Sequence, residues 1–337
     1  MARSMFDTTP RKRLSTRRRI RPRNLLLLFL LAAFIALNGV AWMQAWAMTH
    51  YAPAGQRTSA IEALSPPEKA WIVLTGVSNP RPQNSVTPRD LGLDYETRSI
   101  EVDRGGTLEA WYVPHANPLG IVLMFPGYAA SKDTLLTSSA AFHEIGYDTL
   151  LVDFRGVGGS SGQDTTLGIR EGIDVARSVE YARRTWPGRP TVLYGVSMGS
   201  AAILRAIATE NVQPDAIILE SPFDRLLSTV GNRFHAMGLP AFPASELLVF
   251  WGSVQQGSNG FNHNPADYAR SVRCPALLMR GENDPRVTTS EVAAIMEQLG
   301  GQKRFVNFPN ATHQLLSAAD RALWKSQVTA FLAQVTE

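Results

Sequence analysis

The residue best placed to do chemistry is Ser197, which lies in the sequence Gly195-Val-Ser-Met-Gly199. An apolar run beginning at Thr191 predicts a strand before this serine, and residues 201–207 predict a helix directly after it. So sharp a strand-to-helix turn strains the serine backbone, and only glycine fits two residues to either side. The turn also presents the serine Oγ beside the positive end of a helix. The pattern therefore predicts a nucleophilic serine.

A serine nucleophile needs a histidine that accepts its proton and an acid that orients the histidine. Of the six histidines, only His263 and His313 lie well downstream of the serine. One strand-like apolar run is followed by Asp284 and another by His313, so both residues fall at the carboxyl ends of predicted strands. In parallel sheets this edge carries the chemistry. We therefore predict a triad of Ser197 as nucleophile, His313 as base and Asp284 as acid.

Further motifs occur in the order found in a known family. They are Phe125-Pro-Gly-Tyr128, Asp153-Phe-Arg-Gly-Val-Gly-Gly-Ser-Ser-Gly162, Glu220-Ser-Pro-Phe223 and Gly281-Glu-Asn-Asp-Pro285. With the segments around the serine and His313, they make residues 90–337 resemble the α/β-hydrolase superfamily, in its monoglyceride-lipase-like and serine-aminopeptidase-like branch. The resemblance implies a serine hydrolase that acts through an acyl-enzyme. It also favours Asp284 as the acid over Glu220 and Glu282.

The same resemblance implies which groups would stabilise the oxyanion. By position in the fold they are the backbone N–H groups of Tyr128 and Met198. The family usually has His-Gly where this chain has Pro126-Gly127. Since backbone groups make the hole, this departure affects the shape of the loop and leaves the donors in place.

The remaining pattern predicts an α/β fold with a doubly wound, mostly parallel sheet, because strand-like and helix-like segments alternate from Tyr95 onward. Strands are expected at 95–102, 108–113, 121–125, 149–153, 192–195, 216–219, 276–279 and 304–307. Helices are expected at 133–144, 167–184, 198–209, 290–299 and 315–335. A long insertion at 223–268, rich in large apolar residues, is expected to form a helical cap whose side chains partly line an acyl pocket.

Two other kinds of site are less well supported. Gly156, Gly158 and Gly159 follow a strand, but the third glycine of a dinucleotide-binding motif is misplaced, at Gly162, and no helix opens directly on the loop. No histidines have the spacing of a metal-binding motif such as H-E-x-x-H, and His235 and His263 are expected to be solvated or capping residues. We predict no cofactor and no metal.

Charge is concentrated at one end of the chain. Nine of the 33 Lys and Arg residues lie in residues 1–23, so 24 remain against 28 of the 29 acidic residues in the rest. Residues 25–48 carry no charge and are long enough to cross a bilayer as a helix. The positive-inside rule then leaves the N-terminus in the cytoplasm and the catalytic body outside. A mildly acidic body argues against nucleic acid as a partner.

These features predict a basic cytoplasmic tail (1–23), a transmembrane anchor (24–48), a linker (49–89) and a hydrolase domain (90–337). A cleaved signal peptide is the competing interpretation, since Ala45-Trp-Ala47 is a possible cleavage site and cleavage would release a soluble exported form. In either case we expect the chain without residues 1–50 to be soluble and active. The expected substrate is a small or lipid-like ester, thioester or amide. The alternatives are a non-catalytic binding protein of the same fold, and cofactor-free peroxidase or lyase chemistry on the same triad.

Overall fold

The computed structural model describes residues 21–59 and 64–335, so most of the predicted basic tail lies outside the described residues. The chain divides into two compact units, residues 1–39 and residues 40–337. Helix α1 (Pro22–Thr49) begins in the first unit and ends in the second. Within the described ranges it is the one helix that is long and apolar enough to cross a membrane, judged by length and composition.

The second unit is built on one eight-stranded sheet with the strand order β1-β2-β4-β3-β5-β6-β7-β8. Only the β1–β2 and β2–β4 pairings are antiparallel. The pairings from β4 to β8 are all parallel, which confirms the expected doubly wound, mostly parallel sheet. The strands are β1 (Glu96–Val102), β2 (Gly106–Val113), β3 (Ile121–Phe125), β4 (Asp148–Val152), β5 (Thr191–Val196), β6 (Ala216–Glu220), β7 (Ala276–Gly281) and β8 (Lys303–Phe308).

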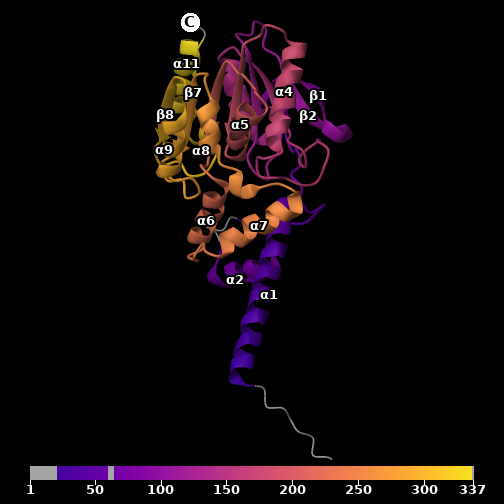
Figure 1. Ribbon diagram of the computed structural model, residues 1–337. Helices are drawn as coiled ribbons and strands as arrows, with labels where there is room; N and C mark the ends of the chain where they lie inside the picture. The colour runs from indigo at the N-terminus through magenta and orange to yellow at the C-terminus, as the bar shows by residue number, and fades with distance from the viewer. Residues whose placement is uncertain (1–20, 60–63, 336–337) are drawn as a thin grey trace, which may run out of the picture. The chain divides into compact units, whose positions relative to one another are not determined.

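Helices cover both faces of the sheet because the central strands are apolar on both sides. One buried cluster includes residues of α4 (Glu171–Thr185), α5 (Met198–Thr209) and α9 (Thr289–Gln298), and α4 and α5 lie in front of the sheet in Figure 1. The other cluster includes residues of α3 (Leu136–Glu144) and of the C-terminal helices α10 (Leu316–Ala319) and α11 (Arg321–Val335).

Two helix predictions were wrong in their limits. The helix expected from Leu167 begins only at Glu171, because Leu167 and Gly168 have φ angles of 58° and 113°, outside the helical range. The single helix expected over 315–335 is broken at Asp320, whose backbone is extended. In addition, a 3₁₀ turn, η4 (Lys132–Leu135), precedes α3.

The insertion between β6 and β7 is helical, with α6 (Leu226–Ala236), α7 (Ala244–Gln256), the turn η5 (Gly260–Asn262), α8 (Pro265–Tyr268) and the turn η6 (Ala269–Ser271). In the segment predicted as a linker lie α2 (Pro66–Thr75) and the start of η2 (Pro88–Leu91). A further turn, η3 (Asp103–Gly105), joins β1 to β2. Parts of the 49–89 segment pair with the body, since Tyr51 N donates to Gln163 O at 2.8 Å and Tyr51 is buried.

Candidate active site

The Ser197 turn has the strained geometry that the glycine spacing predicts. Ser197 joins β5 to α5 with φ of 52° and ψ of −109°. A Cβ added at Gly195 would lie 2.6 Å from the carbonyl carbon of Gly199, and one added at Gly199 would lie 2.3 Å from Phe125 O. The strand and helix therefore pass too closely for any side chain at either position. The serine is held at the N-terminus of α5, where the helix dipole favours negative charge.

The structure brings Ser197, His313 and Asp284 together. His313 Nε2 lies 3.2 Å from Ser197 Oγ, and His313 Nδ1 lies 2.8 Å from Asp284 Oδ2. The other carboxylate oxygen of Asp284 accepts the backbone N–H groups of Arg286 and Val287 at 2.8 and 3.0 Å. Burial by itself raises the pKa of Asp284, but these bonds and His313 outweigh burial and lower it. A carboxylate that stays ionised can hold Nδ1–H and leave Nε2 free to accept a proton.

The loops that carry these two residues are packed tightly together. A Cβ at Gly281, the last residue of β7, would lie 2.4 Å from Thr312 O. Asn283 N also donates to Ala311 O at 2.9 Å. The close approach of the two strand ends fixes the relative positions of Asp284 and His313.

The rival acids are placed differently. Glu220 is fully buried and its carboxylate accepts three hydrogen bonds, from Tyr194 Oη and Trp324 Nε1 at 2.6 Å and from Leu316 N at 3.1 Å. Burial raises its pKa against these three donors. Glu220 thus joins β5, β6 and the C-terminal helices, whereas Glu282 is exposed. Neither carboxylate is bonded to His313 among the described contacts.

The predicted oxyanion donors border the serine. Met198 is the first residue of α5, and Tyr128 follows Gly127, whose added Cβ would lie 3.7 Å from Ser197 Cβ. Over residues 21–59 and 64–335, neither backbone N–H donates to a protein acceptor. Two N–H groups near one nucleophile, both without a protein acceptor, can bind the oxygen of a tetrahedral intermediate.

The side chain of Tyr128 ties the candidate oxyanion loop to distant segments, which the sequence analysis did not predict. Its phenol donates to Met48 O at 2.6 Å and accepts a hydrogen bond from Asn79 Nδ2 at 3.0 Å. Burial raises the pKa of Tyr128, which keeps the phenol neutral. The next residue, Ala129, has a left-handed φ of 51°, and its carbonyl accepts Arg57 Nη1 at 3.0 Å. The candidate oxyanion loop is therefore held by the end of α1 and by the 49–89 segment.

A cavity of about 580 Å³ lies in front of Ser197. No Asp or Glu is among its described lining residues. Of the large apolar residues in the 223–268 insertion, Phe223 lines the cavity, whereas eight others do not: Phe234, Met237, Leu239, Phe242, Leu247, Leu248, Phe250 and Trp251. The cap contributes α6 and the residues just before it, and the 49–89 segment contributes one wall. The lining residues are Arg57, Thr58, Ser59, Ile72, Val77, Asn79, Gly127, Tyr128, Ala130, Thr134, Leu135, Val196, Ser197, Ser221, Phe223, Thr229, Asn232, Arg233, Ala236, Pro285, Arg286, Val287, His313, Gln314 and Leu315.

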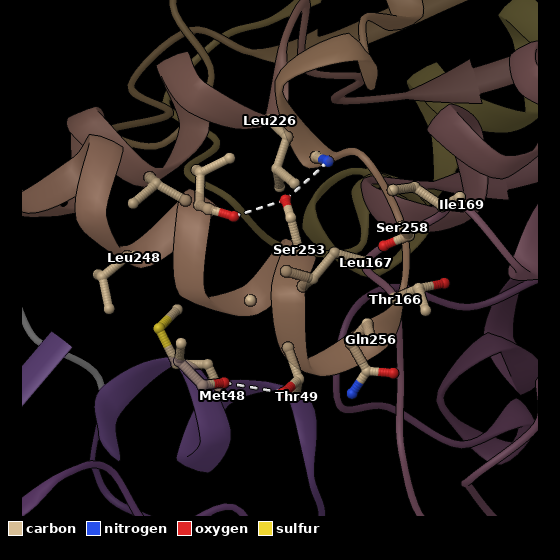
Figure 2. Close-up of a pocket in the computed structure, with 15 residues that line it drawn as sticks. Met48, Thr49, Thr166, Leu167, Ile169, Leu226, Leu248, Ser253, Gln256 and Ser258 are labelled. Atoms are coloured by element: carbon tan, nitrogen blue, oxygen red, sulfur yellow. Dashed lines mark hydrogen bonds between the residues drawn. The ribbon is translucent and has the colours of Figure 1, made fainter. Parts of the chain in front are cut away.

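A second, smaller pocket lies where the end of α1 meets α6, α7 and the 166–169 loop (Figure 2). Its walls are mostly apolar and include Met48, Leu167, Leu226 and Leu248, and Ser253 Oγ is already bonded to Val249 O and Gly260 N. Its volume of about 40 Å³ has room for a few water molecules and not for an acyl chain. It shares no lining residue with the cavity at Ser197.

The glycine-rich loop after β4 accommodates a buried ion pair. The Asp153 carboxylate accepts the N–H groups of Lys132 and Gly159 and contacts the Lys132 ammonium, which is also fully buried. A Cβ at Gly158 would lie 1.8 Å from Asp153 Oδ2. This crowding explains why residue 158 is glycine, and no bound nucleotide is needed to account for it. Across the residues that the structure describes, no group of three or more His, Cys, Asp or Glu is arranged to hold a metal.

His263 was expected to be solvated or capping, and that prediction was wrong. The side chain is fully buried; Nε2 lies 3.2 Å from Leu167 O and Nδ1 lies 3.4 Å from Tyr268 Oη. Burial, reinforced by the charge of Arg205, lowers the pKa of His263 to about 4. It is therefore a neutral core residue that connects the cap to the body.

Comparison with known proteins agrees with this architecture. The family model for serine aminopeptidase S33 matches residues 116–248. The structure of an esterase from Pyrococcus furiosus aligns over 76% of this chain and 96% of that chain, with a TM-score of 0.64 and 24% identity. The chain has the α/β-hydrolase fold. The family match over residues 116–248 supports a hydrolase as its activity.

Two relatives are similar to this chain over half of its length or more. Protein bem46 of Schizosaccharomyces pombe is 23% identical over 241 residues, which are 68% of this chain and 75% of that protein. The lysophosphatidylserine lipase ABHD12 of Mus musculus is 24% identical over 188 residues, which are 54% of this chain and 46% of that protein. The chain thus matches about half the length of ABHD12.

Proposed function

We propose that this α/β-hydrolase is a serine hydrolase that cleaves an acyl ester, thioester or amide through an acyl-enzyme. The observation that carries the proposal is the hydrogen-bonded series from Ser197 Oγ through His313 to the buried Asp284. A serine near a histidine that an ionised acid orients is the arrangement that activates a hydroxyl for attack on a carbonyl.

In the proposed reaction, Ser197 Oγ attacks the carbonyl carbon while His313 Nε2 takes the hydroxyl proton. The N–H groups of Tyr128 and Met198 hold the oxyanion, and the dipole of α5 adds to their effect. His313 then gives the proton to the leaving alcohol, thiol or amine. A water molecule, deprotonated by the same histidine, releases the acid and restores the serine.

Labelling with a fluorophosphonate tests the nucleophile. We expect Ser197→Ala to abolish labelling and to lower turnover of a short-chain ester by at least ~10⁴-fold. Ser221 lines the same cavity, and Ser221→Ala is a matched control that should still be labelled. Labelling of Ser197→Ala at the wild-type rate would refute the proposal.

A second pair of variants tests the acid. Asp284→Asn should lower kcat by ~10⁴-fold, because the imidazole loses the carboxylate that fixes its tautomer. Glu220→Gln should mainly reduce stability, because the structure gives Glu220 three structural donors. A greater loss of kcat in Glu220→Gln than in Asp284→Asn would show that the acid is misassigned.

We also propose that α1 is a retained membrane anchor, with the N-terminus in the cytoplasm and the body on the other side. Support comes from the nine positive charges in residues 1–23 and the uncharged run of residues 25–48 that follows them. The buried positions of Ala41 and Ala45 against the body also favour retention. The full chain should resist carbonate extraction, and protease added outside should digest the body. If the body were protected from that protease in intact cells whose outer layer is permeable, the proposed orientation would be wrong.

A further inference from the structure

Large apolar side chains are exposed on two elements of the body, α2 and α7, and on the loop before α7. Trp71 of α2 is 67% exposed, and Phe242 in the loop is 74% exposed. Phe250 and Val254 lie four residues apart on α7 and are 46% and 57% exposed, so they form an apolar stripe on that helix. Exposed aromatic side chains in such a group usually mark a contact with another phase or molecule.

Both elements contact the last ten residues of α1. Gln44 Nε2 donates to Ile72 O of α2 at 2.5 Å, and Gln255 Nε2 of α7 donates to Trp42 O at 2.8 Å. Trp71 and Val254 are the immediate neighbours of these contact residues in sequence. Figure 1 shows α2 and α7 beside this end of α1. Three of the four exposed side chains, Trp71, Phe250 and Val254, therefore lie on the two helices that contact the end of α1.

The length of the anchor fixes the depth of that point. A helix needs about 20 residues to cross the hydrocarbon core, so a crossing that starts at Leu25 ends near Gln44. Trp42 and Trp46 flank this position, stack with their ring centroids 6.0 Å apart, and are 47% exposed each. Tryptophan prefers the boundary between hydrocarbon and water. Residues that contact Trp42 and Gln44 must then lie at the membrane surface as well.

We propose that Trp71, Phe242, Phe250 and Val254, called here the apolar rim, insert into the interfacial layer of the lipid bilayer that holds the anchor. The inference rests on the proposed retention of α1. It commits to lipid and not to a second protein, because the anchor itself brings α2 and α7 to the depth of the interface. Amphipathic elements that lie in this layer bury their apolar faces about 5–10 Å deep.

The rim also bears on the substrate. Ile72 lines the cavity at Ser197 while its neighbour Trp71 is exposed, so α2 separates that cavity from the rim. Ala236 at the end of α6 also lines the cavity, six residues before Phe242. Helix α2 thus contributes both to the cavity wall and to the membrane-facing surface, and α6 of the cavity wall leads directly into the loop that carries Phe242. The substrate class that fits is an acyl ester amphiphile drawn from the membrane, which deepens the proposed hydrolase function.

Spin labelling of the full chain in phosphatidylcholine nanodiscs tests the rim. In a Cys274→Ser background, which removes the only cysteine, single nitroxides are placed at 71 and 250, with matched nitroxides at the exposed apolar positions Leu119 and Phe305 as controls. We expect the labels at 71 and 250 to collide more with oxygen and less with a water-soluble nickel complex than the controls do. Equal accessibility of all four labels to the nickel complex would overturn the inference.

Enzyme assays separate this inference from the proposed function. The double variant Trp71→Ser, Phe250→Ser should lose at least about tenfold in hydrolysis of an ester embedded in the nanodisc, because each aromatic withdrawn from water contributes about that factor to docking. It should keep wild-type turnover of a water-soluble short-chain ester, and Leu119→Ser should be unchanged on both. Full activity of the double variant on the embedded ester would refute the rim. If the wild type cleaves neither ester, the proposed function fails while the label depths still decide the rim.

Discussion

Removing the phenol of Tyr128 is the sharpest test of how the candidate oxyanion loop is positioned. In Tyr128→Phe the ring remains, but Met48 O loses a 2.6 Å hydrogen bond and accepts from no other donor among the described residues. Asn79 Nδ2 keeps a 3.3 Å contact with Ala47 O. The main cost is thus one unsatisfied, partly buried carbonyl, about 1–3 kcal/mol. For a chain of this size the same cost lowers Tm by several degrees.

The same change should reach the chemistry because Tyr128 supplies a backbone N–H to the proposed oxyanion hole. Complete loss of one such donor costs about 10²–10³ in kcat, so a loosened donor should cost about ten- to a hundredfold. KM should change little, since the donor acts on charge that develops in the transition state. The assay is ester hydrolysis with thermal unfolding measured on the same preparations.

Tyr147→Phe is the matched control, because Tyr147 is also buried but lies outside the cavity. It should keep both kcat and the active-site labelling rate. If Tyr128→Phe had the kcat and Tm of the wild type, the end of α1 would have no part in positioning the loop. A loss of kcat beyond about 10²-fold, as large as that of a whole donor, would mean that the phenol itself donates to the oxyanion.

Three further outcomes are expected. His263 is neutral in the fold, with a pKa of about 4 against an ordinary value near 6.5, so its contribution to stability is complete above that ordinary value and is lost as pH falls toward 4. In urea unfolding between about pH 7 and about pH 4, the wild type should lose about 3 kcal/mol more than His263→Gln, and parallel losses would contradict the burial argument. Gly199→Ala should lower the free energy of unfolding by about 3 kcal/mol or prevent folding, because the added Cβ meets Phe125 O. Gly252→Ala is the control: its Cβ has open space around it, so urea unfolding should show a neutral or stabilising effect. Deleting residues 1–39 should give an active body, while deleting residues 1–50 removes buried Ala41 and Ala45 and should abolish activity; equal ester turnover by both truncated chains would contradict this.

The parts of the fold that the sequence predicts well are those that local pattern determines. The Ser197 turn is predicted by a strand pattern, two glycines and a helix pattern that follow one another directly in the sequence. The eight strands are predicted because each is a short apolar run with clear ends. The same local logic placed Asp284 and His313 on neighbouring strand ends, and the structure has them within hydrogen-bonding distance of each other.

What the sequence could not supply depends on contacts between distant segments. The Tyr128 phenol is hydrogen-bonded to Met48 and Asn79, which lie 80 and 49 positions earlier in the chain. No local sequence pattern predicts contacts between residues so far apart. His263 is buried because a loop with left-handed residues at 167 and 168 meets it, and that loop also shortened α4. The expectation that residues 1–50 are dispensable was made without these contacts, and they lead us to predict instead that only residues 1–39 can be removed without loss of activity.

The packing of the last turns of α1 has a consequence for processing. The peptide bond after Ala47 lies within a continuous helix, Ala45 beside it is only 3% exposed, and Ala47 O contacts Asn79. Proteases cut exposed and mobile backbone, so this bond is protected once the body has folded. A signal peptidase would therefore have to act before the body closes around the helix. The relative rates of cleavage and of folding during export would then determine whether a given molecule is released or stays tethered. A molecule that folded before cleavage would stay tethered for its lifetime.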